Sequence, residues 1–302
     1  MRIPSALQPG DVIGITCPAG YMPTAQAAKA IQTLQKQGYE VWVGKTLGSK
    51  SKNYFSGTDE ERLSELQAML DEPSIKAILC GRGGYGVSRI IDQLDFTKFR
   101  KQPKWIIGFS DITVLHAHVH SRLNIATLHA PMAAAFQKNP RSNVYVQSLL
   151  QILRGEKPVY RCKQHRFNQH GNTEGILVGG NLALLAHLCG TASDIQTRGK
   201  ILFLEDVGEY LYNIDRMMLQ LKRSGKFELL AGLIIGGFTD CKDTERPFGK
   251  KVYEIIASHL KEYSYPICYD FPVSHGKANY ALVSGGNYRL QVSDTGVTMQ
   301  YL

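Results

Sequence analysis

A serine stands where a short apolar run passes directly into a helical pattern. The run Trp105–Phe109 is followed by Ser110, and the helical pattern begins at Asp111. A serine at such a turn projects its hydroxyl from the carboxyl edge of a parallel sheet, and the next amide N–H can face an oxyanion. These are the properties of a nucleophile. Helix capping is the alternative role, because serine is a preferred N-cap and Ile112 replaces the second glycine of the hydrolase elbow.

A glycine-rich loop, Gly81–Gly86, follows the apolar run Ile75–Cys80. Glycines at a sheet edge let backbone amides approach a ligand, so such a loop can hold a phosphate or donate to an oxyanion. The match to the dinucleotide-binding fingerprint is poor, because the loop comes after the third predicted strand and lacks the acidic residue that the motif needs downstream. The loop is therefore either functional or an ordinary tight turn.

The second half of the chain offers two carboxylates and a histidine. Glu205 and Asp206 end the apolar run that begins at Ile201, and His275 lies in a loop flanked by Pro272 and Gly276. A carboxylate at the carboxyl edge of a sheet can orient an imidazole, as the acid of a catalytic triad does. The alternatives are a helix cap or surface turn for the carboxylates and simple exposure for the histidine.

Two further groups of residues could carry chemistry of other kinds. His116, His118 and His120 alternate, but on a helix only His116 and His120 share a face and no acidic ligand is near, so a polar helix face is favoured over a metal site. Cys17 and Cys80 each end an apolar run and could be thiol nucleophiles, but such residues are more often small buried hydrophobic groups. We expect no metal and no cofactor.

The elements that position these residues alternate between short apolar runs and amphipathic segments. This alternation predicts an α/β fold with a parallel sheet covered by helices. In the first half we expect strands at Val12–Cys17, Tyr39–Val43, Ile75–Cys80, Trp105–Phe109 and Ile125–Leu128, and helices at Thr24–Gln37, Thr58–Leu70, Val87–Leu94, Asp111–Arg122 and Val144–Leu153. A Thr58-x-x-Glu61 capping box opens the second of these helices.

A polar, basic segment from Gly155 to Asn172 separates the two halves and is typical of a connection between domains. It predicts domains at 1–160 and 161–302. Beyond it we expect strands at Gly175–Val178, Lys200–Leu204, Leu230–Ile235 and Ile267–Tyr269, helices at Leu182–Leu188, Ile214–Lys222 and Lys250–Lys261, and short antiparallel strands from Ala281 to Leu302.

The 302 residues carry a formal net charge of +9, and their composition of 43% hydrophobic and 20% charged residues is that of a globular protein. Such a charge could serve to bind nucleic acid, an anionic surface or an anionic small substrate, and composition alone does not choose among them, but no nucleic-acid-binding motif accompanies it, so nucleic acid is disfavoured. The longest apolar stretch, Leu229–Phe238, is far too short to span a bilayer, so we expect no membrane association. The first twenty residues lack a secretory h-region and the six cysteines lack a CxxC pair, which together predict reduced thiols in the cytoplasm.

Taken together in chain order, these motifs resemble the LD-carboxypeptidase family of serine peptidases. The resemblance covers nearly the whole chain, from about residue 9 to about residue 290, and rests on six short segments. They are Cys-Pro-Ala-Gly at 17–20, Arg-Gly-Gly-Tyr-Gly at 82–86, Gly-Phe-Ser-Asp-Ile-Thr at 108–113, Gly-Gly-Asn-Leu at 179–182, Leu-Glu-Asp at 204–206 and Val-Ser-His-Gly at 273–276.

The resemblance implies a flavodoxin-like amino-terminal domain, residues 1–160, that carries the nucleophile, and a smaller α/β domain, residues 161–302, that carries the acid and base at a shared interface. It implies a triad of Ser110, Glu205 and His275 with a covalent acyl-enzyme. With it we expect backbone oxyanion donors at Asp111 and Gly84. For the substrate we expect contacts from the same glycine loop, at Arg82 (through its bidentate fork), Gly83 and Tyr85.

The family members that this chain resembles imply, as substrate, a murein tetrapeptide that loses its terminal D-alanine during peptidoglycan recycling in the cytoplasm. A sister branch of the microcin-immunity type, which cleaves aminoacyl-nucleotide amides, would use the same triad. A non-catalytic module that binds an anionic ligand in the glycine loop is the alternative outside enzymes. The resemblance also implies a homodimer.

Overall fold

A computed structural model describes residues 1–137 and 139–302, and the chain divides into two compact units. The first unit contains Met1–Glu156 and a short return of the chain at Tyr280–Val283, and the second contains Lys157–Asn279 and Ser284–Leu302. The sequence pattern placed everything after residue 160 in one domain. The return at Tyr280–Val283 has no signal in the order of the elements, because it contributes a single edge strand to a distant sheet.

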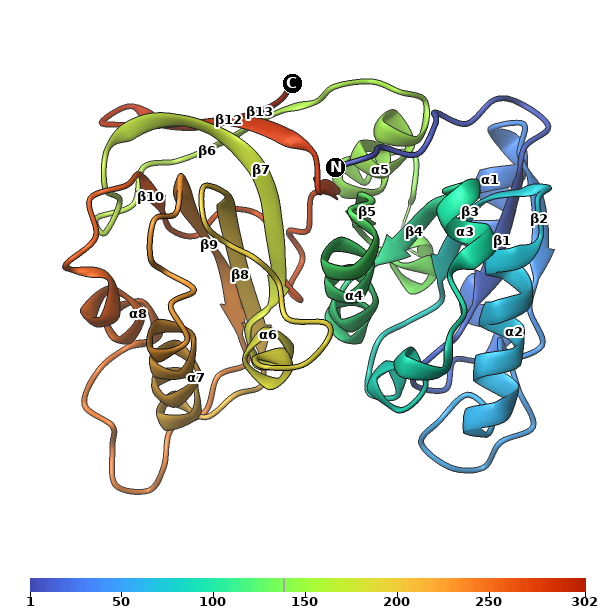
Figure 1. Cartoon of the computed structure of the whole chain (residues 1–302), viewed down its shortest axis with the longest axis horizontal. Helices are drawn as coiled ribbons and strands as arrows, with labels where there is room; N and C mark the ends of the chain where they lie inside the picture. The colour runs from blue at the N-terminus through green and yellow to red at the C-terminus, as the bar shows by residue number, and fades with distance from the viewer. Residues whose placement is uncertain (138) are drawn as a thin grey trace. The chain divides into compact units, whose positions relative to one another are not determined.

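The first unit is built on a six-stranded sheet of order β11-β5-β4-β3-β1-β2 (Figure 1). Strands β1 to β5 run parallel, and their order 2-1-3-4-5 is that of flavodoxin-like folds. The predicted α/β class and flavodoxin-like sheet are therefore confirmed. The strands are β1 (Val12–Thr16), β2 (Glu40–Val43), β3 (Ile75–Cys80), β4 (Trp105–Gly108), β5 (Thr127–His129) and β11 (Leu282–Ser284).

Helices cover this sheet because their apolar faces must be buried against it. The predicted capping box is present: Glu61 N–H donates to Thr58 Oγ1 over 3.2 Å, and Thr58 N–H donates to Glu61 Oε2 over 2.8 Å. The helices are α1 (Ala28–Lys36), α2 (Asp59–Asp71), α3 (Thr97–Lys101), α4 (Thr113–Leu123) and α5 (Val144–Leu153). The helix predicted at Val87–Leu94 is wrong: this segment forms two 3₁₀ turns, η2 (Val87–Arg89) and η3 (Ile91–Gln93).

The second unit has a seven-stranded mixed sheet of order β10-β9-β8-β7-β12-β13-β6. Its long strand β7 (Gly171–Asn181) belongs to both parts of the sheet: residues 171–176 pair antiparallel with β12, and residues 177–181 pair parallel with β8. The other strands are β6 (Val159–Cys162), β8 (Ile201–Val207), β9 (Gly232–Thr239), β10 (Ile267–Cys268), β12 (Asn287–Ser293) and β13 (Gly296–Tyr301). Strand β6 lies in the segment that was expected to be a plain connection.

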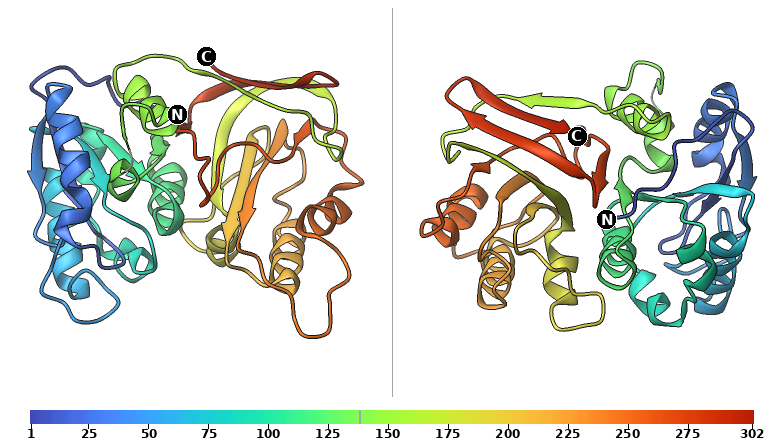
Figure 2. Two further views of the ribbon diagram at one scale, coloured as in Figure 1. Left: turned by 180° about the vertical axis from the view of Figure 1, so that it is seen from behind. Right: turned by 45° about the horizontal axis from the view of Figure 1, so that its top comes forward.

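Three helices pack on the parallel part of this second sheet, namely α6 (Leu182–Leu188), α7 (Leu211–Arg223) and α8 (Val252–Leu260). Figure 2 shows the antiparallel ribbon of β12 and β13 beside β6, with the C-terminus at the end of β13. Strands β8 and β9 are parallel and largely buried. Open α/β sheets place their functional groups at the carboxyl ends of such strands.

Candidate functional site

Ser110 has a backbone conformation that few serines adopt. Strand β4 is buried throughout and ends at Gly108, and Ser110 follows with φ of 64° at the start of the 3₁₀ turn η4 (Ser110–Ile112). A left-handed non-glycine residue between a strand and a helix is the backbone geometry of a nucleophile elbow. The N-cap residues of η4 and α4 are Phe109 and Ile112, and neither helix has a side-chain capping hydrogen bond. Ser110 therefore caps neither of them. The capping alternative is therefore wrong.

The glycine loop lies directly against Ser110. A Cβ atom placed on Gly83 would come within 2.7 Å of Ser110 Cβ and 3.3 Å of the Asp111 nitrogen, so only glycine allows this approach. Gly20 N–H donates to the Gly83 carbonyl over 3.0 Å and fixes the other side of the loop. The Asp111 amide stands in the first turn of the helix, where N–H groups have no intrahelical acceptor. The geometry therefore suits an oxyanion beside Ser110.

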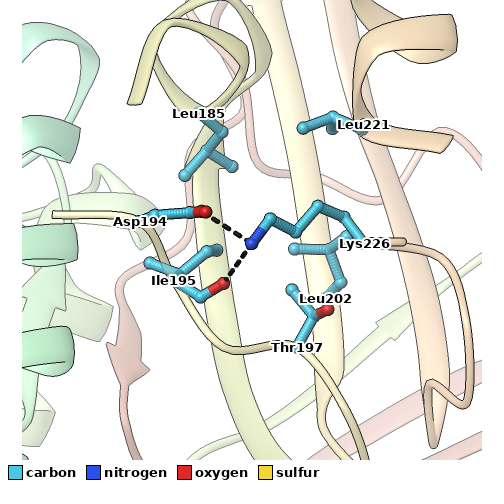
Figure 3. A pocket seen from close by; sticks show the side chains of 7 residues that line it. All are labelled: Leu185, Asp194, Ile195, Thr197, Leu202, Leu221 and Lys226. Carbon is cyan, nitrogen blue, oxygen red and sulfur yellow. Dashed lines mark hydrogen bonds and ion pairs between the residues drawn. The ribbon is translucent and has the colours of Figure 1, made fainter. Parts of the chain in front are cut away.

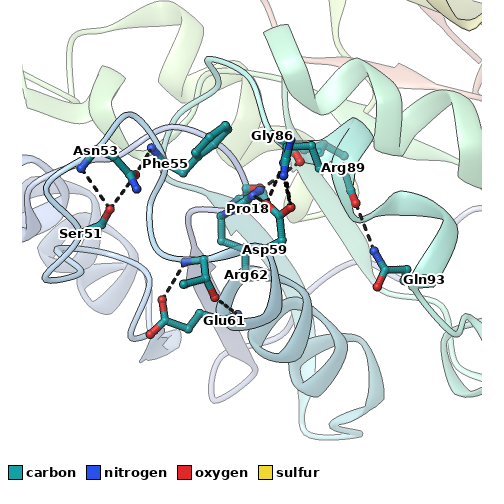
Figure 4. A network of polar contacts seen from close by, with 12 residues as sticks. Pro18, Ser51, Asn53, Phe55, Asp59, Glu61, Arg62, Gly86, Arg89 and Gln93 are labelled. Carbon is teal, nitrogen blue, oxygen red and sulfur yellow. Dashed lines mark hydrogen bonds and ion pairs between the residues drawn. The ribbon is translucent and has the colours of Figure 1, made fainter.

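Two side chains tie the end of the glycine loop to its surroundings. Asp111 Oδ2 accepts the Val87 N–H over 2.8 Å, and burial raises the pKa of this carboxyl to about 6 despite that bond and the charge of Arg62. The guanidinium of Arg62 donates through Nη1 to the carbonyls of Pro18 (2.7 Å) and Gly86 (3.0 Å), so it joins the loop after β1 to the glycine loop after β3. Figure 4 shows Arg62 with Pro18 and Gly86.

Arg62 was missed by the sequence reading. Its side chain is fully buried and pairs with Asp59, which also binds the exposed Arg89 through Nε over 2.8 and 2.9 Å. A signal existed: Arg62 has the helical spacing of Leu66 and Met69, so it stands on the buried face of α2. An arginine at such a position needs buried partners, and backbone carbonyls of catalytic loops are one source of them.

In the second unit, Glu205 and His275 form a hydrogen-bonded pair. His275 Nδ1 lies 2.6 Å from Glu205 Oε2, and the Glu205 side chain is fully buried while 14% of the His275 side chain is exposed. Burial lowers the pKa of His275, but the hydrogen bond with Glu205 and the charges of Glu205 and Asp206 together raise it above the ordinary value. A carboxylate that binds Nδ1 leaves Nε2 as the nitrogen for proton transfer.

Two glycines in β9 allow the His275 loop to approach Glu205. The pairing of β8 with β9 shifts register between Leu204 and Asp206, which leaves Gly236 and Gly237 as a bulge opposite Glu205. A Cβ on Gly236 would lie 2.3 Å from the Val273 carbonyl, and one on Gly237 would lie 2.6 Å from the Cβ of Ser274. Gly237 N–H donates to Val273 O over 2.9 Å, which holds the loop in place.

Asp206, the neighbouring carboxylate, has a different role. Its Oδ1 accepts from Asn181 Nδ2 over 2.7 Å and from Val207 N–H over 2.8 Å, and its Oδ2 accepts from Ala183 N–H over 3.0 Å. Burial raises the pKa of this carboxyl to about 7. Asp206 therefore holds the start of α6, and Glu205 is the carboxylate that binds the imidazole.

The cysteines and histidines that were considered as alternative sites have structural roles. Burial raises the pKa of Cys17 to about 12 and that of Cys80 further, so neither is a thiolate at neutral pH. His116 Nε2 lies 2.9 Å from the Gly108 carbonyl, and burial lowers its pKa to about 4; His120 Nε2 lies 3.0 Å from Thr127 Oγ1. Within residues 1–137 and 139–302, no three His, Cys, Asp or Glu side chains gather as a metal site.

A small pocket in the second unit is lined by a lysine that forms an ion pair (Figure 3). Lys226 Nζ lies 2.6 Å from Asp194 Oδ1 and donates to the Ile195 carbonyl over 2.9 Å, and apolar side chains line the rest. Because the Lys226 ammonium already has partners within the protein, we interpret this pocket as part of the packing beneath α7. Over the same described ranges, no helix has the length and apolar character needed to cross a bilayer.

Two family models match the chain, and both describe the same class of hydrolase. The LD-carboxypeptidase N-terminal domain matches residues 13–130, and the LD-carboxypeptidase C-terminal domain matches residues 174–290. The chain belongs to the LD-carboxypeptidase family of serine peptidases.

The curated relatives extend over nearly the whole chain. A probable murein peptide carboxypeptidase of Bacillus subtilis is 31% identical over 96% of this chain and 92% of its own length, and a murein tetrapeptide carboxypeptidase of Pseudomonas aeruginosa is 32% identical over 89% of each. A microcin C7 self-immunity protein of Escherichia coli is 26% identical over 97% of this chain and 94% of its own.

Among solved structures, the muramoyltetrapeptide carboxypeptidase of Oxalobacter formigenes superimposes with a TM-score of 0.87 at 28% identity, covering 96% of this chain and 98% of its own.

Proposed function

We propose that this protein is a serine LD-carboxypeptidase that releases the terminal D-alanine from murein tetrapeptide during peptidoglycan recycling. The observation that carries the proposal is the buried Glu205 carboxylate 2.6 Å from His275 Nδ1, because such a pair has the geometry of the acid and base of a triad. The left-handed Ser110 at the strand-to-helix turn supplies the matching nucleophile. The relatives named for murein peptides support the substrate class.

In the proposed mechanism Ser110, Glu205 and His275 act as a unit. His275 Nε2 takes the Ser110 proton as the oxygen attacks the scissile carbonyl carbon, and Glu205 stabilises the imidazolium that forms. The tetrahedral intermediate collapses when His275 protonates the leaving amine of the D-residue. Water, deprotonated by the same histidine, then hydrolyses the acyl-enzyme and restores Ser110.

The oxyanion of this reaction would be held by backbone N–H groups. We assign this role to Asp111 and Gly84, because the glycine loop packs on Ser110 and Asp111 stands in the first turn of the helix. Gly83 supports the loop through its close approach, and Arg82 and Tyr85 are our candidates for substrate contacts. Loss of one such donor typically lowers kcat by about 10²- to 10³-fold.

The experiment that tests the proposal is product analysis with purified murein tri-, tetra- and pentapeptides and an aminoacyl-sulfamoyl adenylate. We expect D-alanine from the tetrapeptide and little from the D-Ala-D-Ala end of the pentapeptide, because an inverted centre moves the carbonyl away from Ser110. Cleavage of the sulfamoyl adenylate alone would instead place the protein with the microcin-immunity branch, which the Escherichia coli relative keeps as the second candidate.

We further propose that the protein acts in the cytoplasm as a homodimer. Every cysteine of the chain is a free thiol, which agrees with a reducing compartment. The dimer rests on the family resemblance, and sedimentation velocity of the purified chain at micromolar concentration tests it. A monomer across that range would refute it.

A further inference from the structure

The segment 44–57 packs on the loops that surround Ser110 in the first unit. Phe55 forms an antiparallel bridge with Gly20, Tyr21 N–H donates to the Tyr54 carbonyl over 3.0 Å, and Ser56 N–H donates to the Ala19 carbonyl over 3.0 Å. Gly20 in turn donates to the Gly83 carbonyl. The segment is therefore fixed, through the backbone, to the same glycine loop that lies against the nucleophile.

Tyr54 brings its hydroxyl to the open side of that glycine loop. A Cβ atom on Gly84 would lie 2.9 Å from Tyr54 Oη, whereas one on Gly83 would lie 2.8 Å from Ser110 Oγ. The two glycines thus stand between the nucleophile and a phenol. Tyr54 is 58% exposed, and no protein group in the described ranges hydrogen-bonds its hydroxyl, so that hydroxyl can donate to a ligand.

Phe55 holds Tyr54 in this place. Its ring lies under the guanidinium groups of Arg62 and Arg89, at 4.9 and 5.6 Å from the centroid, and meets the Tyr54 ring edge-on at 5.4 Å. Asn53 Oδ1 accepts the Phe55 N–H over 3.0 Å, which orders the tip of the segment, as Figure 4 shows. The position of the phenol is therefore built in before any ligand arrives.

Arg82 supplies a cation near the same glycines, because a Cβ atom on Gly20 would lie 3.7 Å from Arg82 Nε and 3.8 Å from the Cα of Gly84. Its Nη1 donates to the Tyr21 carbonyl over 3.0 Å, and Tyr21 N–H donates to the Tyr54 carbonyl, so the backbone of Tyr21 binds both the Arg82 side chain and the Tyr54 backbone. Arg82 makes no ion pair with any carboxylate in the described ranges, and its side chain is exposed. The remaining guanidinium nitrogens are therefore available to an anion.

The charged side chains of segment 44–57 are all positive, and the one carboxylate that binds the segment from outside, Glu65 on α2, is occupied by Thr46 and Thr16. Lys45, Lys50 and Lys52 are exposed on the same segment, and no acidic residue occurs between residues 41 and 58. The nearest carboxylate along the chain after Tyr54, Asp59, is already bound by Arg62 and Arg89. The surroundings thus favour an anionic group over a neutral or cationic one.

We infer that Arg82 and Tyr54 together form the subsite for the free terminal carboxylate of the substrate, with the guanidinium as the charged donor and the phenol as the second donor. The inference rests on the proposed function and deepens it, because it makes the carboxylate, and not the side chain of the last residue, the group that is recognised. The subsite lies beside Gly83 and Gly84, so a carboxylate held there places the last peptide bond over the oxyanion donors.

The test compares two substrates, a murein tetrapeptide with a free terminal carboxylate and the same peptide with a terminal amide. Tyr54→Phe should lower kcat/KM for the free acid by about tenfold and for the amide by less than about twofold, since a hydrogen bond to a charged group is lost only in the first case. Arg82→Gln should act in the same direction and more strongly. In the double variant the two losses should not simply add, because the residues share one ligand.

Tyr39→Phe is the control for the loss of a tyrosine hydroxyl away from the glycine loop. It removes a tyrosine hydroxyl just before β2, at the amino edge of the same sheet, and should leave both substrates unaffected. Equal losses for acid and amide in Tyr54→Phe, or no loss for either, would overturn the inference.

A binding measurement separates this inference from the proposed chemistry. In the Ser110→Ala background, calorimetry with the same two peptides should show tighter binding of the free acid, and Tyr54→Phe should remove most of that difference. If wild type cleaves neither peptide but the preference depends on Tyr54 and Arg82, the proposed function fails and the subsite stands. If wild type cleaves the tetrapeptide and the preference is unchanged in both variants, the subsite fails and the proposed function stands.

Discussion

The backbone of Ser110 is strained, because the left-handed conformation costs a non-glycine residue about 1–2 kcal/mol. We expect Ser110→Ala to abolish turnover with little change in melting temperature, since its hydroxyl caps no helix. Ser110→Gly should be equally inactive but unfold at the same or a higher temperature than Ser110→Ala, because glycine relieves the strain. Product release and thermal denaturation of both variants check this, and residual turnover near wild type in either would refute the proposed nucleophile.

The pair of Glu205 and His275 predicts a pH profile with a definite direction. The base must be neutral, so kcat/KM should rise as the pH passes through the raised pKa of His275. Glu205→Gln removes the charge that raises this pKa, so the midpoint should move to lower pH while the plateau falls by about 10³- to 10⁴-fold. Rate measurements across pH 5 to about 9 for both proteins provide the comparison.

Asp206 gives the control for that prediction. Asp206→Asn should impair the start of α6 more than the reaction, because its oxygens bind Asn181, Ala183 and Val207. A larger loss of kcat in Asp206→Asn than in Glu205→Gln would mean that the wrong carboxylate has been assigned.

At the scale of the elements, Arg62 links α2 to two loops that follow different strands. Arg62→Lys keeps a charge but cannot reach the carbonyls of Pro18 and Gly86 and the carboxylate of Asp59 together. We expect a loss of about 3 kcal/mol in unfolding free energy and a fall in kcat with a smaller change in KM, because the glycine loop loses its anchor. Denaturant unfolding and steady-state kinetics measure both effects.

Arg89→Lys is the matched variant, because Arg89 binds the same Asp59 from the exposed side. Its melting temperature and kcat should stay near wild type. A drop in kcat in Arg89→Lys as large as in Arg62→Lys would show that Asp59, and not the buried guanidinium, sets the loop.

Elements with a local sequence signal could be predicted from the sequence, and elements that depend on tertiary contacts could not. Strands such as β3 and β4, and the capping box at Thr58, were predictable because their signals are local: apolar runs and fixed spacings. The left-handed conformation of Ser110, the β9 bulge that lets the His275 loop approach Glu205, and the 3₁₀ turns after Gly86 were not predictable. Each arises from tertiary contacts with a distant segment, and a residue pattern does not contain such contacts.

The candidate residues divide in the same way. The ordered motifs and the resemblance indicated Ser110, Glu205 and His275, and the contacts give the physical reason why Glu205 and not Asp206 binds the imidazole. Tyr54 had no sequence signal at all, because a tyrosine in a polar loop is ordinarily just exposed. The bridge between Phe55 and Gly20, which brings Tyr54 to the glycine loop, is visible only in the structure.

At the scale of the whole molecule, the proposed chemistry uses only side chains and backbone amides of the chain. We therefore expect dialysis against EDTA to leave the rate on murein tetrapeptide unchanged. His116 and His120, for which a polar helix face was favoured over a metal site, have Gly108 and Thr127 as partners. A steep loss of rate that added zinc restores would contradict this and reopen the question of a metal site.

The return of Tyr280–Val283 to the first unit has a consequence for biosynthesis. Strand β5 keeps an open edge until β11 arrives, and β11 is encoded more than a hundred residues after the rest of that sheet. On the ribosome, the first unit therefore cannot complete its sheet until nearly the whole polypeptide has emerged, so its nascent form carries an unpaired strand edge of the kind that invites aggregation or chaperone binding. Fragments that end at Glu156 should share this defect, and supplying residues 280–302 as a separate peptide should partly relieve it.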